Sequence, residues 1–406
     1  MVSAIKLLRG NVVKLGLLAV LSVPMLAALR GGAGNNDEHR HLAPPPSLPT
    51  SWQAFLQLPT QTDDWINDHF GMRDRLLKAN NRLRFALFHE FPTIQMAAGR
   101  HGRVFLAAHS VTAPPYSAIT NVCGGKPPPA PETAEYFSTM VADFERMGMH
   151  PAVLIVPSAA AVYSGDTPNW LQPRCGADDT AVATVLADPA LSPLARQRIF
   201  YPLQQMRALA GNDAVFPKTW FHWSGPALDE IARLTVAHLW GRAPAQQAPW
   251  PVKMNWKDSD VSHLFPGVKL SSLIAEPDFE AAHVQACYGP NCFPEFAGIA
   301  NYAQVLDDVS RFTNPAAPER RLLIVSDSFG SKSSGWFARY YRTVEQMATH
   351  SINDMSQADV DTLKQVLLRD PEHTDILFLY HDGAAVYNTL RQGIQRLHQL
   401  RPPSGG

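Results

Sequence analysis

Short apolar runs alternate with helical patterns over most of the chain. Three runs are continuous and have the length of a single strand: Ala152–Val156, Leu322–Val325 and Thr374–Tyr380. Because a strand that is buried on both faces shows no polar alternation, these runs predict inner strands of a parallel sheet. Helical spacing is found over Pro131–Met147, Ala227–Leu239 and Ala358–Leu368. Strands that alternate with helices predict an α/β fold, in which helices flank a parallel sheet.

The chain before this core has a different pattern. Apolar residues recur at helical spacing over Thr62–Phe88, which predicts an amphipathic helix that is broken at Gly71 and packs on a core. A hairpin is predicted over Gly99–Leu106. Residues 31–60 are polar and rich in proline, which is typical of a linker because proline fixes φ and removes a donor. Residues 61–400 are then expected to form one domain, with an insertion at about residues 241–320.

Positive charges precede an apolar run at the N-terminus. Lys6, Arg9 and Lys14 come before or at the start of the uncharged stretch Leu15–Leu29. This order is typical of an export signal, and residues 1–30 are interpreted as an uncleaved signal anchor in preference to a cleaved signal peptide. A buried core helix is the third alternative. Since the positive charges stay inside, we expect the body of the protein in the periplasm, held at the inner membrane by its N-terminus.

The charge balance excludes some functions. The net charge of the 406 residues is -1, so no basic field attracts nucleic acid, and no nucleic-acid partner is expected. No glycine-rich phosphate-binding motif is present, since Gly124-Gly125-Lys126 runs into prolines and cannot open a helix. We therefore expect no nucleotide, and neither a cofactor nor a metal is predicted.

The four cysteines fit an exported protein. Cys287 and Cys292 bracket a turn sequence, so a small-loop disulfide is plausible there, and Cys123 and Cys175 would form the second pair. Four cysteines allow three connectivities, and the sequence does not choose among them. A zinc site is the rival interpretation, but the chain has no CxxC or HExxH spacing.

One serine and one histidine are candidates for acyl-transfer chemistry. Ser328 follows the apolar run that ends near Ser326, and a serine on a tight turn after a buried strand is where α/β hydrolytic folds place a nucleophile. His222 lies between aromatic residues and can act as the base that a serine hydroxyl requires. The structural alternatives are a serine turn without chemical meaning and a packed histidine.

Four segments carry a resemblance to a known family. They are Glu38–Pro46 together with Asp63–Phe88, the hairpin Gly99–Leu106, the motif Trp220–Trp223, and the turn Ser326–Phe329. In this order they resemble the AlgX/AlgJ family of SGNH-hydrolase-like polysaccharide O-acetyltransferases. The histidine motif precedes the serine motif, which is the circularly permuted order of that family. The resemblance implies an SGNH-hydrolase-like α/β fold.

The resemblance also implies roles for individual residues. Ser328 would be the nucleophile that accepts the acetyl group, and His222 would be its base. The substrate would be a secreted polysaccharide, and a membrane protein would deliver the acetyl donor. Trp223 and Trp336 are candidates for walls of a site that excludes water.

The orienting carboxylate of a serine–histidine–aspartate triad is missing from its usual place. Trp220 stands two residues before the histidine, where the family has aspartate, and Ser326 replaces a family glycine. The sequence places none of Asp213, Asp229 and Asp327 beside the histidine. Two functions follow as alternatives. The first is an O-acetyltransferase or acetylesterase with a degraded triad, and the second is a non-catalytic polysaccharide-binding or assembly subunit.

Overall fold

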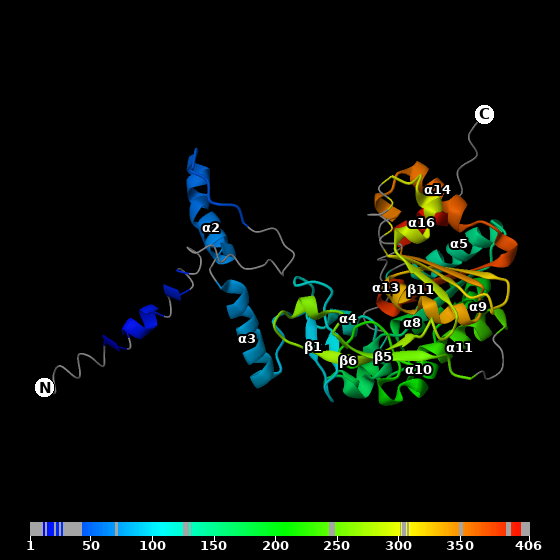
Figure 1. Ribbon diagram of the computed structural model, residues 1–406, viewed down its shortest axis with the longest axis horizontal. Coiled ribbons are helices and arrows are strands. Elements are labelled where there is room, and N and C mark those ends of the chain that lie inside the picture. Colours follow the sequence, from blue (N-terminus) through cyan, green and yellow to red (C-terminus); the bar gives the residue numbers. More distant parts are fainter. Residues whose placement is uncertain are drawn as a thin grey trace. The chain divides into compact units, whose positions relative to one another are not determined.

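The computed structural model describes most of the chain, in two compact units that are treated separately below (Figure 1). The described residues are 11–12, 14–19, 22–23, 26, 43–69, 72–124, 130, 132–242, 248–300, 302, 306, 308–348, 352–386 and 391–398. The first unit contains Met1–Thr93 and Val261–Lys269, and the second contains Ile94–Asp260 and Leu270–Gly406.

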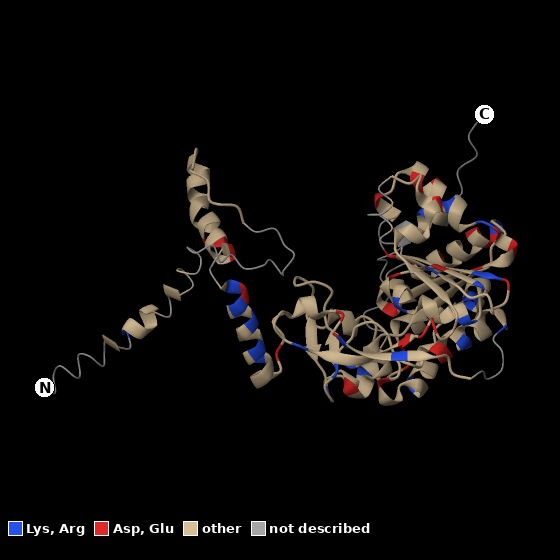
Figure 2. Ribbon diagram, in the orientation of Figure 1, with Lys and Arg blue, Asp and Glu red and all other residues tan. Residues whose placement is uncertain are grey.

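The first unit is built on two helices, α2 (Trp52–His69) and α3 (Arg73–Phe88). Helix α2 ends at His69 and α3 begins at Arg73, on either side of the predicted break at Gly71. Two expectations are wrong, however. Helix α2 begins inside the predicted linker, and neither helix packs on a core, because α2 has no buried residue and α3 buries only Asn81. Helix α3 is rich in basic residues, which Figure 2 marks along its ribbon.

The second unit contains a seven-stranded sheet with the order β4-β3-β11-β9-β10-β8-β7. The strands are β4 (Ile199–Phe200), β3 (Pro151–Val156), β11 (Thr374–His381), β9 (Arg321–Ser326), β10 (Thr343–Ala348), β8 (Val309–Thr313) and β7 (Gln285–Tyr288). The first five strands are parallel, whereas β8 runs antiparallel to β10 and β7 antiparallel to β8. All six residues of β3 are buried. The predicted α/β class with a mostly parallel sheet is thus confirmed.

Helices cover both faces of this sheet. Along β3, Leu154 belongs to one hydrophobic cluster and Val153 to another, because successive side chains point to opposite faces. Helices α10 (Leu203–Leu209) and α11 (Leu228–Trp240) contribute to the first cluster, and α5 (Thr133–Arg146), α14 (Gln357–Leu367) and α16 (Arg391–His398) to the second. The predicted helices therefore appear at α5, α11 and α14, with ends that shift by one or two residues.

Shorter elements connect the layers. They are α4 (Ser117–Thr120), α6 (Ala159–Val162), α7 (Gln172–Cys175), α8 (Ala181–Ala187), α9 (Pro193–Arg198), α13 (Ser328–Ser333) and α15 (Asp382–Val386). The predicted hairpin is present as β1 (Met96–Ala98) paired with β2 (Val104–Leu106), and β5 (Val252–Asp258) pairs with β6 (Ser271–Pro277). The predicted insertion is in part integral to the fold, since it supplies β7 and β8 to the main sheet.

Both disulfides join the pairs that the sequence favours, Cys123–Cys175 and Cys287–Cys292. All four cysteines are therefore oxidised, which removes the rival zinc interpretation. Two disulfides are typical of an oxidising, extracytoplasmic compartment. The predicted anchor over residues 1–30 lies mostly outside the described residues. Of the helices that the structure describes, none combines the length and apolar character needed to cross a membrane.

Candidate active site

Ser328 stands at the start of α13, directly beyond the end of β9, and its side chain is exposed. Asp327 caps this helix, and its Oδ1 accepts the Phe329 N–H at 2.8 Å. Its Oδ2 accepts the backbone N–H of His381 at 2.9 Å and lies 2.7 Å from the ring Nδ1 of the same histidine. Asp327 therefore ties the turn that carries the serine to the end of β11.

Ser326, which stands where the similar motif has glycine, fits this turn because Gly330 faces it. A Cβ added at Gly330 would lie 2.1 Å from Ser326 Oγ, so only glycine is accommodated at position 330. The buried Ser326 hydroxyl also accepts a hydrogen bond from Gln346 Nε2 at 3.3 Å. The replacement of the family glycine by Ser326 is thus compatible with the close turn.

His222 Nε2 lies 2.8 Å from Ser328 Oγ, although 106 residues separate the two in the chain. The sequence predicts this proximity from the paired motifs. The imidazole packs against the rings of Phe221 and Phe329, with ring centroids 4.9 and 5.1 Å away. These aromatic contacts fix the plane of the imidazole beside the serine.

Asp260 supplies the carboxylate that is missing at position 220. Its Oδ2 lies 2.6 Å from His222 Nδ1 and accepts the His222 backbone N–H at 3.0 Å, while Oδ1 accepts the Phe221 N–H at 2.9 Å. A proton on Nδ1 is therefore directed to Asp260, and Nε2 is left to accept the hydroxyl proton of Ser328. The expectation of a degraded triad is wrong.

The charge of Asp260 is favoured by its surroundings. Burial raises the pKa of this carboxyl group. The hydrogen bond and positive charge of His222, together with the N–H groups of Phe221 and His222, lower the pKa by a larger amount. The resulting pKa lies below the ordinary aspartate value. Asp260 is therefore ionised at neutral pH, where it can stabilise the imidazolium that forms when His222 takes a proton.

The aspartates considered from sequence have other partners. Asp213 pairs with Arg103, Asp229 accepts from Arg339 Nη1 at 2.6 Å, and Asp327 holds His381. Nothing in the spacing of the chain points to Asp260, which lies 38 residues after the histidine, just beyond β5. The only available signal was a carboxylate that directly follows a strand.

Trp220 does not take the place of the triad carboxylate. It is 9% exposed, and its indole N–H is buried without a hydrogen-bond partner among the described residues. Trp223 is also buried, at 1% exposure, and donates its N–H to the Phe329 carbonyl at 2.9 Å. Trp223 therefore supports the turn that carries Ser328, with a ring that is itself buried. Trp336 is 2% exposed and lines a cavity that is described further below.

A backbone donor for an oxyanion is available at the same turn. In the first turn of α13, the Phe329 N–H is bound by the Asp327 carboxylate and the Gly330 N–H by the Asp327 carbonyl at 3.1 Å. The N–H of Ser328 itself has no acceptor in the described part of the chain, as expected for the first residue of a helix. This N–H can donate to the negative oxygen that develops when Ser328 attacks a carbonyl group.

We predict that Trp220→Asp does not raise the activity of the protein, because Asp260 already binds His222 Nδ1. The variant should also be less stable, since it exchanges a buried indole for a buried carboxylate. Release of p-nitrophenol from p-nitrophenyl acetate and urea unfolding would measure the two effects. Trp220→Phe, which keeps a buried ring, is the matched control. A faster reaction in Trp220→Asp alone would show that Asp260 is not the working carboxylate.

The structure is similar to several known structures. No protein-family model and no curated protein matches the chain. A DHHW family protein from Eubacterium siraeum is 16% identical, with a TM-score of 0.44 over 66% of this chain and 89% of that one. Pseudomonas aeruginosa AlgX is 12% identical, with a TM-score of 0.44 over 76% of this chain and 67% of that one. The O-acetyltransferase domain of Pseudomonas putida AlgJ is 14% identical, with a TM-score of 0.38 over 75% of this chain and 99% of that one.

Proposed function

We propose that this protein transfers acetyl groups to a secreted polysaccharide, or removes them from it, through an acetyl-Ser328 intermediate. The observation that carries the proposal is the hydrogen-bonded series Ser328 Oγ, His222 and Asp260, with contacts of 2.8 and 2.6 Å. A nucleophile beside a base that is itself oriented by a carboxylate is the arrangement that activates a serine hydroxyl. The resemblance of the sequence motifs to the AlgX/AlgJ family supports acetyl as the transferred group.

The first half-reaction forms the covalent intermediate. Ser328 Oγ attacks the carbonyl carbon of the acetyl donor, and its proton passes to His222 Nε2. The carbonyl oxygen becomes negative and accepts a hydrogen bond from the Ser328 N–H, while Asp260 stabilises the imidazolium. The bond to the leaving group then breaks, and His222 returns the proton to that group. Acetyl-Ser328 and the protonated leaving group of the donor are the products.

The second half-reaction releases the acetyl group. A sugar hydroxyl of the polysaccharide gives its proton to His222 and attacks the acetyl carbon, and the proton then returns to Ser328 Oγ. Water in place of the sugar gives hydrolysis, so the balance between transferase and esterase depends on how well water is excluded. We further propose that a membrane protein delivers the donor and that the N-terminal segment holds the body near the periplasmic face of the inner membrane.

The alternative function, a non-catalytic binding or assembly subunit, was suggested by the missing carboxylate. Asp260 removes that reason. The alternative predicts no acetylation of the serine.

Detection of the acetyl-enzyme tests the proposed function. The full chain is mixed with p-nitrophenyl acetate and quenched with acid, and its peptides are analysed by mass spectrometry. We expect one acetyl group on the peptide that contains Ser328, with no such label in Ser328→Ala. Ser110→Ala, which removes an exposed serine far from this turn in sequence, is the control and should be labelled normally. An unlabelled wild-type protein would favour the binding subunit.

A further inference from the structure

A cavity of about 480 Å³ lies beside the nucleophile within the second unit. Ser331 and Lys332 line it, and they follow Ser328 on α13 by three and four residues. Residues at these spacings lie on the same face of a helix, about 5–6 Å apart. The cavity therefore begins one helical turn from Ser328, on the face of α13 that carries the nucleophile.

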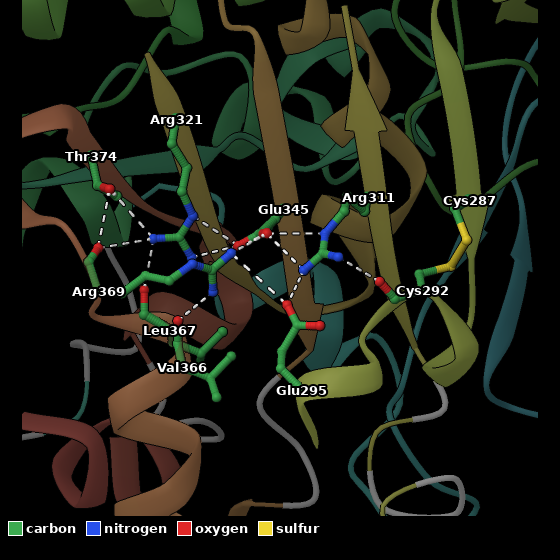
Figure 3. A network of polar contacts seen from close by, with 10 residues as sticks. All are labelled: Cys287, Cys292, Glu295, Arg311, Arg321, Glu345, Val366, Leu367, Arg369 and Thr374. Atoms are coloured by element: carbon green, nitrogen blue, oxygen red, sulfur yellow. Dashed lines mark hydrogen bonds and ion pairs between the residues drawn. A yellow bond between two sulfur atoms is a disulfide. The ribbon is translucent and has the colours of Figure 1, made fainter. Parts of the chain in front are cut away.

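An exposed aromatic ring forms part of the cavity wall. Tyr288, at the end of β7, is 64% exposed and meets the buried Phe312 edge to face, at 5.7 Å between ring centroids. Its neighbour Cys287 is bridged to Cys292, whose carbonyl accepts from Arg311 Nη1 at 2.7 Å (Figure 3). The disulfide and the arginine hold the segment around Tyr288 against the sheet. The ring thus presents an open surface from a fixed position.

Polar groups surround this ring. Three carboxylates and two lysines line the cavity, namely Glu276, Glu280, Asp308, Lys253 and Lys332. Lys253 is already paired with Asp278 at 2.9 Å and with Glu280 at 3.6 Å. An apolar ring surface next to hydrogen-bonding groups matches a pyranose sugar, which has apolar C–H faces and a rim of hydroxyl groups. An acyl chain would remove water from these charged groups and offer them no hydrogen bonds in return.

The balance of charge selects among sugars. Carboxylates outnumber ammonium groups around the cavity by one, and this excess is unchanged when the ion-pair partners Lys257 of Glu276 and Asp278 of Lys253 are counted. A uronic acid would bring a further negative charge to this lining and would be repelled. The hydroxyl groups of an uncharged sugar, in contrast, can donate to the carboxylates.

We propose that this cavity is the acceptor subsite of the protein and binds an uncharged polysaccharide, with a pyranose ring stacked on Tyr288. The proposal rests on the proposed function, because it places the acceptor sugar one helical turn from acetyl-Ser328. The lining of the cavity determines which class of sugar can act as acceptor, whereas the triad does not discriminate among sugars. Lys332 lines the cavity four residues after Ser328 and is available to a sugar hydroxyl, since it makes no ion pair with the described residues.

Binding is tested first, and without catalysis. The full chain with Ser328→Ala is titrated by calorimetry with three uncharged hexasaccharides (gluco-, manno- and galacto-configured) and with hexamannuronate and hexagalacturonate. We expect at least one uncharged hexasaccharide to bind more tightly than both uronates. Adding Tyr288→Ala should weaken that binding about tenfold, through loss of the aromatic surface. Trp170→Ala is the matched control, since it removes another exposed aromatic side chain that does not line the cavity.

A charge reversal tests the selection by charge. Glu280→Lys places a positive charge at the exposed rim, where the Glu280 side chain is 92% accessible. We expect this variant to bind the uronates several-fold more tightly relative to the uncharged hexasaccharide, and to lose that gain in high salt. Tighter binding of a uronate by the unchanged cavity, or no binding of any uncharged hexasaccharide, would overturn the proposal.

Transfer is tested second, with Ser328 intact and p-nitrophenyl acetate as donor. Tyr288→Ala should leave acetylation of Ser328 unchanged but reduce transfer to the bound hexasaccharide about tenfold, as a higher KM for the acceptor. An equal loss in both steps would show that Tyr288 acts on the fold and not on the acceptor. If the wild-type serine is never acetylated, the proposed function is wrong, whereas the titrations still report whether the cavity binds an uncharged sugar.

Discussion

Asp260→Asn should lower the rate of Ser328 acetylation by p-nitrophenyl acetate about 10⁴-fold, the loss expected when a triad carboxylate becomes an amide. The carboxylate makes three contacts, with the backbone N–H groups of Phe221 and His222 and with the His222 ring, and only the ring contact depends strongly on charge. An asparagine can keep part of the backbone contact. The asparagine amide can also donate to Nδ1, which places the imidazole proton on Nε2. A protonated Nε2 can no longer accept the proton of Ser328 Oγ.

The matched control is Asp258→Asn, two residues earlier at the exposed end of β5. This variant should acetylate at the wild-type rate. The thermal midpoints of both variants would show whether the fold is intact. A loss of less than about tenfold in a folded Asp260→Asn variant would mean that His222 does not depend on this carboxylate as a triad base does.

The sheet could be predicted from the sequence because its strands are locally distinctive. The runs at β3, β9 and β11 are apolar on both faces, and this pattern needs no knowledge of distant residues. The edge of the sheet could not be predicted in the same way. Strand β7 has four exposed residues, and its place is set by pairing with β8. Such a strand carries little signal in its own sequence.

The site was likewise predictable only where its residues stand in a distinctive local sequence. Ser328 and His222 each stand in a short motif, so sequence alone brought them together. Asp260 stands in no motif, because its contact with the histidine depends on how the chain returns after β5. Local spacing drew attention to Trp220 instead, a position that does not carry the carboxylate in this protein. Amphipathic spacing was misleading in a similar way at α2, where no residue is fully buried.

A buried charge network supports the same sheet, and it is drawn in Figure 3. Glu345 on β10 is 1% exposed and binds three arginines: Arg311 at 3.0 Å, Arg321 at 2.8 Å and Arg369 at 2.6 Å. Arg311 also pairs with Glu295. The network therefore joins β8, β9 and β10 to the segment after α14.

The charges in this network depend on one another. Burial raises the pKa of Glu345, but the positive charges of Arg321, Arg369 and Arg311 lower it by a larger amount. The pKa therefore lies below its ordinary value of 4.5. A carboxyl group with a lowered pKa stabilises the folded state above its unfolded pKa, and this contribution is lost as the pH falls through its folded pKa. Burial also lowers the pKa of Arg321, which remains charged because a guanidinium titrates far above neutral pH.

Glu345→Gln should lower the free energy of unfolding at pH 7 by about 3–5 kcal/mol, because it leaves buried guanidinium charges without their shared partner. Urea unfolding would measure the loss, and Glu135→Gln on the exposed side of α5 is the matched control, with little expected effect. The difference between wild type and Glu345→Gln should persist down to pH 4.5 and shrink below it, where the wild-type carboxyl group takes up its proton. A difference that is the same at every pH would assign the loss to packing around residue 345, since Glu345 is the one titratable group by which the two proteins differ.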